Sequence, residues 1–162
     1  MNAKGTVHKF GDNVDTDVII PARYLNTASH KELAAHCMED IDAEFVNKVH
    51  EGDIMVAEKN FGCGSSREQA PEIIKALGIQ CVIAKSFARI FFRNSINNGL
   101  LLIEQPTLHD DIKEGDTVSV VMNEHIDYNG KEYPIASLPE NLMDIIRAGG
   151  LVKAMRKLNG LD

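Results

Sequence analysis

Short apolar runs divided by turn residues mark the first two thirds of the chain. Runs of about four residues, bounded by glycine, proline or polar residues, are typical of strands that are buried on both faces. The runs lie at residues 18–20, which end at Pro21, and at residues 54–57, 81–84 and 100–103. This pattern predicts four buried strands.

Helix-like spacing separates these runs. Ser29 and Glu32 have the spacing of a capping box, and apolar residues follow at steps of four, which predicts one helix or two successive short ones. Residues 72–77 and 86–98 predict two more helices, each followed by a glycine. The side chains expected to face the core are Leu33, Cys37, Ile41 and Phe45 in the first segment, Ile73, Ile74 and Leu77 in the second, and Phe87, Ile90 and Phe91 in the third.

The last third of the chain has a β-rich pattern before it ends in helices. Residues 117–121 alternate between apolar and polar, and residues 126–128 and 131–133 flank Asn129-Gly130, a strong β-hairpin signal. Two closing helices are expected on either side of a pair of glycines, at residues 142–147 and 151–158.

The order of these elements indicates an α/β layer arrangement. We found no internal repeat, low-complexity segment or flexible linker, so a single domain over residues 1–162 is expected. A chain of this length is long enough to bury one sizeable core. Its hydrophobic fraction of 44% and charged fraction of 25% are those of an ordinary globular protein.

The charge balance narrows the choice of partners. The formal net charge is -7, and no run of basic residues offers a face to phosphate backbones or anionic lipids. We therefore expect neither nucleic acid nor a membrane as a partner. The first five residues contain no apolar segment of a secretory signal, which favours a cytoplasmic location.

Three cysteines, Cys37, Cys63 and Cys81, are spaced too widely to form the close pairs that usually anchor zinc or an iron–sulfur cluster. An odd number also argues against a disulfide framework. We expect no metal bound by this chain, with Cys37 and Cys81 as buried structural thiols.

The segment 60–71, Asn-Phe-Gly-Cys-Gly-Ser-Ser-Arg-Glu-Gln-Ala-Pro, is the most informative part of the sequence. A strand passes to a helix here through two glycines and two hydroxyls, so free N–H groups, the helix N-terminus and Arg67 could together hold a carboxylate. A nucleophile elbow and a phosphate-binding P-loop both fail on spacing. The competing structural interpretation is that Ser65 to Glu68 form a capping box beside a tight turn.

A second polar segment, residues 12–17, holds three carboxylates immediately before a predicted strand. It lacks the glycine and glutamate that a calcium-binding EF-hand loop requires. Either a turn with side-chain caps or an active-site role for part of the segment fits these residues.

Three motifs in register resemble the swivelling domain shared by aconitases and isopropylmalate dehydratases. They are residues 15–21, 62–68 and 85–90, and the resemblance covers about residues 5–105, followed by a β-hairpin and helical part over about residues 106–162. It implies a swivelling β/β/α three-layer domain. A free-standing chain of this length resembles the family's small subunits of isopropylmalate dehydratase, because aconitases carry the domain fused to others.

The resemblance also implies roles for individual residues. Ser65 falls on the family's catalytic serine, Ser66 on a substrate-binding neighbour, Arg67 on an arginine that holds a substrate carboxylate, and Asp17 on an active-site aspartate. Cys63 stands where aconitases have glutamate, which favours the isopropylmalate branch.

A substrate-reading loop is implied after Pro21. Relatives that act on tricarboxylates have arginine at the position of Asn26, whereas Leu25 is a candidate for part of an apolar wall. Arg23 could itself serve a third carboxylate, and Tyr24 and Leu25 could instead be plain core anchors.

The activity implied by the resemblance is that of a hydro-lyase in leucine biosynthesis, which interconverts 2-isopropylmalate and 3-isopropylmalate. It requires a four-iron, four-sulfur cluster held by a large-subunit partner in a heterodimer or heterotetramer. Related dehydratases of homoaconitate, citraconate or 2,3-dimethylmalate share the three motifs. A non-catalytic anion-binding module and an RNA-binding relative of aconitase are alternatives of another class, the latter opposed by the acidic charge.

Overall fold

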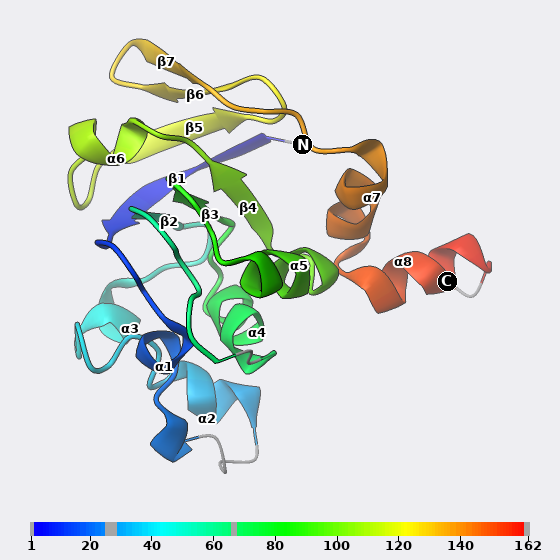
Figure 1. The fold of residues 1–162 in the computed structure, drawn as a ribbon, viewed down its shortest axis with the longest axis horizontal. Coiled ribbons are helices and arrows are strands. Elements are labelled where there is room, and N and C mark those ends of the chain that lie inside the picture. The colour runs from blue at the N-terminus through cyan, green and yellow to red at the C-terminus, as the bar shows by residue number, and fades with distance from the viewer. Residues whose placement is uncertain (1, 25–28, 66–67, 161–162) are drawn as a thin grey trace.

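The computed structural model of the protein describes residues 2–24, 29–65 and 68–160. One mixed sheet runs through it, with the strand order β4-β3-β2-β1-β5-β6-β7 (Figure 1). The strands β1 to β4 are parallel, and β5 to β7 continue the sheet in antiparallel fashion. Their bounds are β1 Asn2–Lys9, β2 Ile54–Ala57, β3 Cys81–Ala84, β4 Leu101–Glu104, β5 Thr117–Val121, β6 His125–Tyr128 and β7 Lys131–Pro134.

The helices are mostly short. They are α1 Thr16–Ile19, α2 His30–Ala34, α3 Phe45–Lys48, α4 Gln69–Ala76, α5 Arg89–Asn97, α6 Leu108–Asp111, α7 Glu140–Ala148 and α8 Leu151–Leu158, with a 3₁₀ turn η1 at Ala22–Tyr24. No helix in the described part of the chain is long and apolar enough to cross a membrane.

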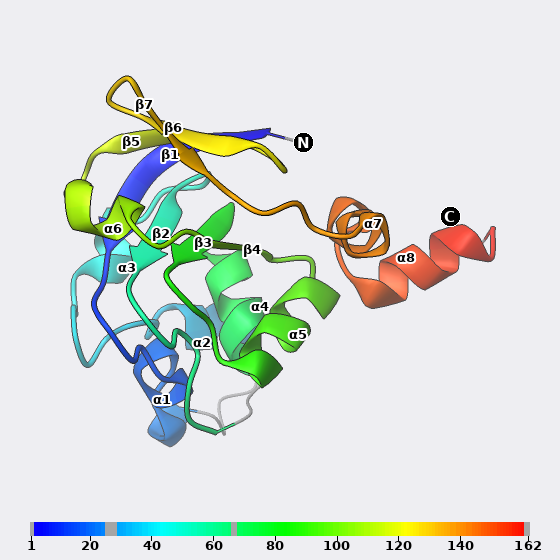
Figure 2. The ribbon, with the colours of Figure 1, turned by 45° about the horizontal axis from the view of Figure 1, so that its top comes forward.

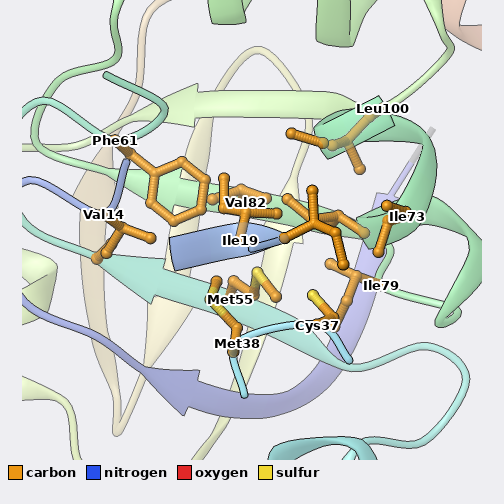
Figure 3. Packing of buried hydrophobic residues seen from close by; sticks show 14 of the residues in the cluster. Val14, Ile19, Cys37, Met38, Met55, Phe61, Ile73, Ile79, Val82 and Leu100 are labelled. Atoms are coloured by element: carbon orange, nitrogen blue, oxygen red, sulfur yellow. The ribbon is translucent and has the colours of Figure 1, made fainter. Parts of the chain in front are cut away.

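Strands β2 and β3 are buried on both faces, because each is apolar throughout. On one face, Met55 and Val82 pack with α1, α2 and α4 in a core that also holds Phe61 and Cys37 (Figure 3). On the other face, alternate residues of the same strands pack against the antiparallel half of the sheet and against α7; they are Ile54, Val56, Cys81 and Ile83.

The molecule therefore has three layers. Helices α2, α4 and α5 cover one side of the parallel strands, and the antiparallel half of the sheet curls over the other side (Figures 1 and 2). This arrangement confirms the predicted α/β fold with β/β/α layers.

Most predicted elements are present, and the hairpin is among the best defined. Strands β6 and β7 pair as Tyr128 with Lys131 across Asn129 and Gly130, which have φ angles of 52° and 81°. Two residues with positive φ are what a tight type I′ hairpin turn requires.

The prediction of a strand at residues 18–20 was wrong. This segment forms helix α1, because the side chain of Asp15 accepts a hydrogen bond from the Val18 N–H at 2.8 Å and caps the helix. A run of three apolar residues does not distinguish a strand from one buried helical turn. The sheet instead gains β1, whose largely polar residues gave no apolar run.

Two side chains expected in the core are exposed. Ile41 is 51% exposed, because the segment after α2 turns and does not continue as a helix to α3. Ile90 is 56% exposed, because α5 begins only at Arg89 and directs Phe91 inward. The other predicted core residues are buried or packed against the core.

Candidate active site

The three motif segments lie side by side at one end of the parallel strands, near α1, α4 and α5 (Figure 2). The Gly62 N–H donates to the Val14 carbonyl at 2.7 Å, and the Thr16 N–H donates to the Cys63 carbonyl at 2.9 Å. On the other side, the Ala88 N–H donates to the Phe61 carbonyl at 2.9 Å. The glycine-rich loop is thus held between the residues before α1 and the residues before α5.

Two glycines give this loop its shape. Gly62 and Gly64 have φ angles of 84° and 89°, a conformation that glycine adopts without steric cost. A Cβ atom on Gly62 would lie 2.1 Å from Cγ of Phe91, so the loop rests directly on α5 at this point.

Ser65 is exposed at the end of the described part of this loop. The Thr16 hydroxyl donates to the Ser65 carbonyl at 2.7 Å, which fixes the serine backbone and leaves its side chain out of this bond. A hollow of about 230 Å³ opens beside it, lined by Thr16, Gly62, Ser65, Ala88, Arg89, Ile90, Phe91 and Asn94. The predicted catalytic serine therefore faces a small, mostly carbon-lined hollow.

The capping-box interpretation of Ser65 to Glu68 does not hold. Helix α4 begins at Gln69, and the residue at its N-cap is Glu68, which makes no side-chain capping bond. Ser65 lies four residues before the first helical residue, too early to cap α4. Pro71 falls in the opening turn, where proline is tolerated.

The carboxylates of residues 12–17 divide into two kinds. Asp12 accepts a hydrogen bond from the Lys59 N–H at 2.9 Å, and Asp15 caps α1. These two side chains hold turns together. Asp17, which the resemblance places in the active site, is exposed in the first turn of α1.

Arg23 is bonded to two carboxylates of the chain itself. Its guanidinium bonds both oxygens of Asp40, at 2.7 and 3.3 Å, and one oxygen of Glu39 at 3.0 Å. The hydrogen bonds to Asp40 and the stacked Tyr24 ring hold the guanidinium in place, and its pKa is raised above the usual value, first by Asp40. The neighbouring candidates Leu25 and Asn26, like Ser66 and Arg67, lie outside the described residues.

The three cysteines do not form a ligand set for an iron–sulfur cluster. Cys37 lies in the core on the helical side of the parallel sheet and Cys81 in the core on its other side, so the sheet separates them. Burial raises the pKa of Cys81 to about 12 and also raises the pKa of Cys37, which keeps both thiols protonated. Cys63 is half-buried in the site loop, where burial and the Asp15 carboxylate raise its pKa.

The residues that sequence analysis did not select come mainly from α5. Arg89, Ile90 and Asn94 line the hollow beside Ser65, and Thr16 anchors the serine backbone. Arg89 and Ile90 belong to the third motif, which was the one available signal. The helical spacing assigned Ile90 to the core, so its place beside the hollow was not predicted.

Comparison with known proteins identifies the family of this chain. Residues 36–108 match the family described as the aconitase C-terminal domain. The 3-isopropylmalate dehydratase small subunit of Lachnospira eligens is 63% identical over 100% of both chains, and that of Clostridioides difficile is 56% identical over 99% of this chain and 100% of its own.

A solved structure has the same fold. The crystal structure of 3-isopropylmalate dehydratase from Methanocaldococcus jannaschii superposes with a TM-score of 0.92 at 51% identity and covers 98% of this chain and 96% of its own. Similarity of this level covers nearly the whole chain. The chain belongs to the family of 3-isopropylmalate dehydratase small subunits, built on the aconitase C-terminal domain.

Proposed function

We propose that this chain is the small subunit of a 3-isopropylmalate dehydratase and that Ser65 is the base of the hydro-lyase reaction. The observation that carries this proposal is the loop of residues 60–65, which is fixed on both sides and presents Ser65 to a hollow. Full-length relatives named for this activity support the assignment. The reaction interconverts 2-isopropylmalate and 3-isopropylmalate and serves leucine biosynthesis.

The reaction begins with removal of a proton from a carbon beside a carboxylate. A serine hydroxyl is too weak an acid to ionise unaided, so Ser65 can take this proton only where its alkoxide is stabilised. Arg67 and the loop N–H groups are the candidates for this stabilisation, and Ser66 and Arg67 would bind a substrate carboxylate. One such donor typically contributes roughly 2.7–4 kcal/mol to transition-state stabilisation.

Loss of hydroxide from the neighbouring carbon needs a Lewis acid, and no cysteine set in the described residues could hold one. In this family that chemistry belongs to a four-iron, four-sulfur cluster, which we assign to a large-subunit partner. This chain's own part is to hold the substrate carboxylate and to move the proton at Ser65, with Asp17 as a second active-site group.

The engagement of Arg23 by Asp40 and Glu39 removes one candidate partner for a third carboxylate. These contacts favour a dicarboxylate over the tricarboxylate homoaconitate. Citraconate and 2,3-dimethylmalate remain the alternative substrates.

Partner dependence tests this function. The purified chain should fold but leave isopropylmalate unchanged, and addition of a family large subunit, reconstituted with its cluster, should start turnover. Absorbance of the unsaturated intermediate and the ratio of the two isomers are the measurements. Turnover by the isolated chain, or an inactive reconstituted complex whose partner binds, would refute the proposal.

A further inference from the structure

Ile90 occupies an unusual position for a large apolar side chain. It is the second residue of α5 and is 56% exposed, although the next residue, Phe91, is buried. Consecutive residues on a helix point about 100° apart, so burying Phe91 turns Ile90 outward. A single exposed isoleucine is common on protein surfaces and means nothing by itself.

The exposure of Ile90 becomes significant because of where the side chain lies. It lines the same hollow as Ser65, together with Asn94 one helical turn later and the carbon atoms of Ala88. Residues four apart lie on one face of a helix, so α5 presents the face of Ile90 and Asn94 to the hollow.

The distance between this helix face and Ser65 is fixed by packing. Gly62 rests on the Phe91 ring, and Phe61 packs edge-on against the same ring with centroids 5.4 Å apart. The hydrogen bond from the Ala88 N–H to the Phe61 carbonyl ties the start of α5 to the loop. Ile90 is therefore held in place relative to the serine.

We infer that Ile90 forms part of the apolar wall that contacts the branched alkyl group of the substrate. The inference rests on the function proposed above, in which the substrate carries one isopropyl group beside two carboxylates. The carboxylates need donors such as Arg67 and the loop N–H groups, whereas the isopropyl group gains only from contact with carbon. Ile90 and Ala88 supply carbon surface on the α5 side of the hollow.

The test compares two unreactive dicarboxylates as competitive inhibitors of the reconstituted enzyme, isopropylsuccinate and methylsuccinate. Both lack the hydroxyl group that the reaction eliminates, and they differ only in the alkyl branch. Ile90→Ala should raise the inhibition constant of isopropylsuccinate by about 10- to 200-fold, the range for trimming a hydrophobic pocket. The constant for methylsuccinate should change by less than about threefold, because the smaller branch does not reach Ile90.

Two further variants complete the test. Ile90→Val removes one carbon and should give an intermediate change. Val152→Ala trims an apolar side chain that is 72% exposed on α8 and does not line the hollow, so it should change neither constant. Equal increases in the inhibition constants of both inhibitors would overturn the inference and assign Ile90 to contact with the partner chain. Unchanged constants for Ile90→Ala would overturn it as well.

The test distinguishes a failure of this inference from a failure of the proposed function. If the reconstituted wild-type enzyme does not convert isopropylmalate, the function proposal fails and the inference falls with it. If the wild-type enzyme is active but Ile90→Ala keeps the wild-type preference for the isopropyl branch, only the inference fails.

Discussion

Gly62 shows how single residues hold the loop that carries Ser65. Its φ angle is positive, and the Phe91 ring fills the space where a side chain would begin. Gly115 has nearly the same φ angle, 88°, but no atom lies within 4 Å of the position of its missing Cβ. The two glycines therefore separate the cost of backbone conformation from the cost of packing.

Gly115→Ala should lower the free energy of unfolding by about 1–2 kcal/mol, the cost of a left-handed residue with a side chain. Gly62→Ala should cost a further 1–3 kcal/mol or so, because the methyl group must displace Phe91. Chemical denaturation of the two variants and the wild type measures the difference. Equal destabilisation would show that the loop does not rest on Phe91.

Glu39 gives a pH-dependent prediction. Its carboxylate accepts a hydrogen bond from the Tyr24 hydroxyl at 2.6 Å, is bonded to His36 at 2.9 Å and pairs with Arg23. Together, with Tyr24 first, these partners lower the pKa of Glu39 from 4.5 to about 2. A lowered pKa in the folded state means that the ionised carboxylate stabilises the fold above pH 4.5 or so and that this stabilisation is lost as the pH falls toward 2.

Glu39→Gln removes this titration. The stability difference between wild type and variant should be constant near neutral pH and should close as the pH falls below about 4.5. Unfolding curves recorded at several pH values measure it. A difference that persists unchanged at pH 2 would contradict the assigned contacts.

Among the elements, strands and helices with long or well-bounded patterns were predictable. Strands β2, β3 and β4 follow from their apolar runs, and α4 from its apolar side and its terminal Gly78. The strand β1 could not be predicted, because its largely polar residues form no apolar run and its central place in the sheet depends on pairing with β2 and β5. Such long-range pairing leaves no local signal.

The candidate site was also predictable only in part. The motifs singled out the loop of Ser65, which lies beside a hollow, and the α1 segment, whose predicted strand is a helix. The contribution of α5 could not be derived, because helical periodicity gives only an apolar side and not the residue at which the helix begins. Starting α5 at Arg89 turned Ile90 from a core residue into a lining residue.

The loop after η1 is the element expected to read the substrate. Asn26→Arg should shift the preference of the reconstituted enzyme toward a tricarboxylate such as homoaconitate, because a third carboxylate needs a charge-assisted partner. Leu25→Ala should weaken the transition-state binding of isopropylmalate by about 1–3 kcal/mol. The measurement is kcat/KM of each variant on both substrates; equal losses on both would show that this loop does not discriminate between them.

At the scale of the whole molecule, two cores on opposite faces of the parallel strands make a frame, and three segments at one end of it meet at the proposed site. The frame holds the proposed base and the loop proposed to bind a carboxylate, but no described cysteine set for a cluster. This division of labour explains why a chain with a well-formed loop would need a second subunit to complete its chemistry.

The most direct measurement is the interconversion rate of 2- and 3-isopropylmalate by the reconstituted enzyme with Ser65→Ala in place of wild type. The Thr16 hydroxyl bonds the Ser65 carbonyl and not its side chain, so the variant should keep its fold and its partner. Ser137→Ala, a matched change at an exposed serine outside the site, should keep full activity. Loss of a general base predicts a decrease of about 10²–10⁴-fold for Ser65→Ala; a variant that retains more than roughly a tenth of wild-type turnover would contradict the role of Ser65 as the base.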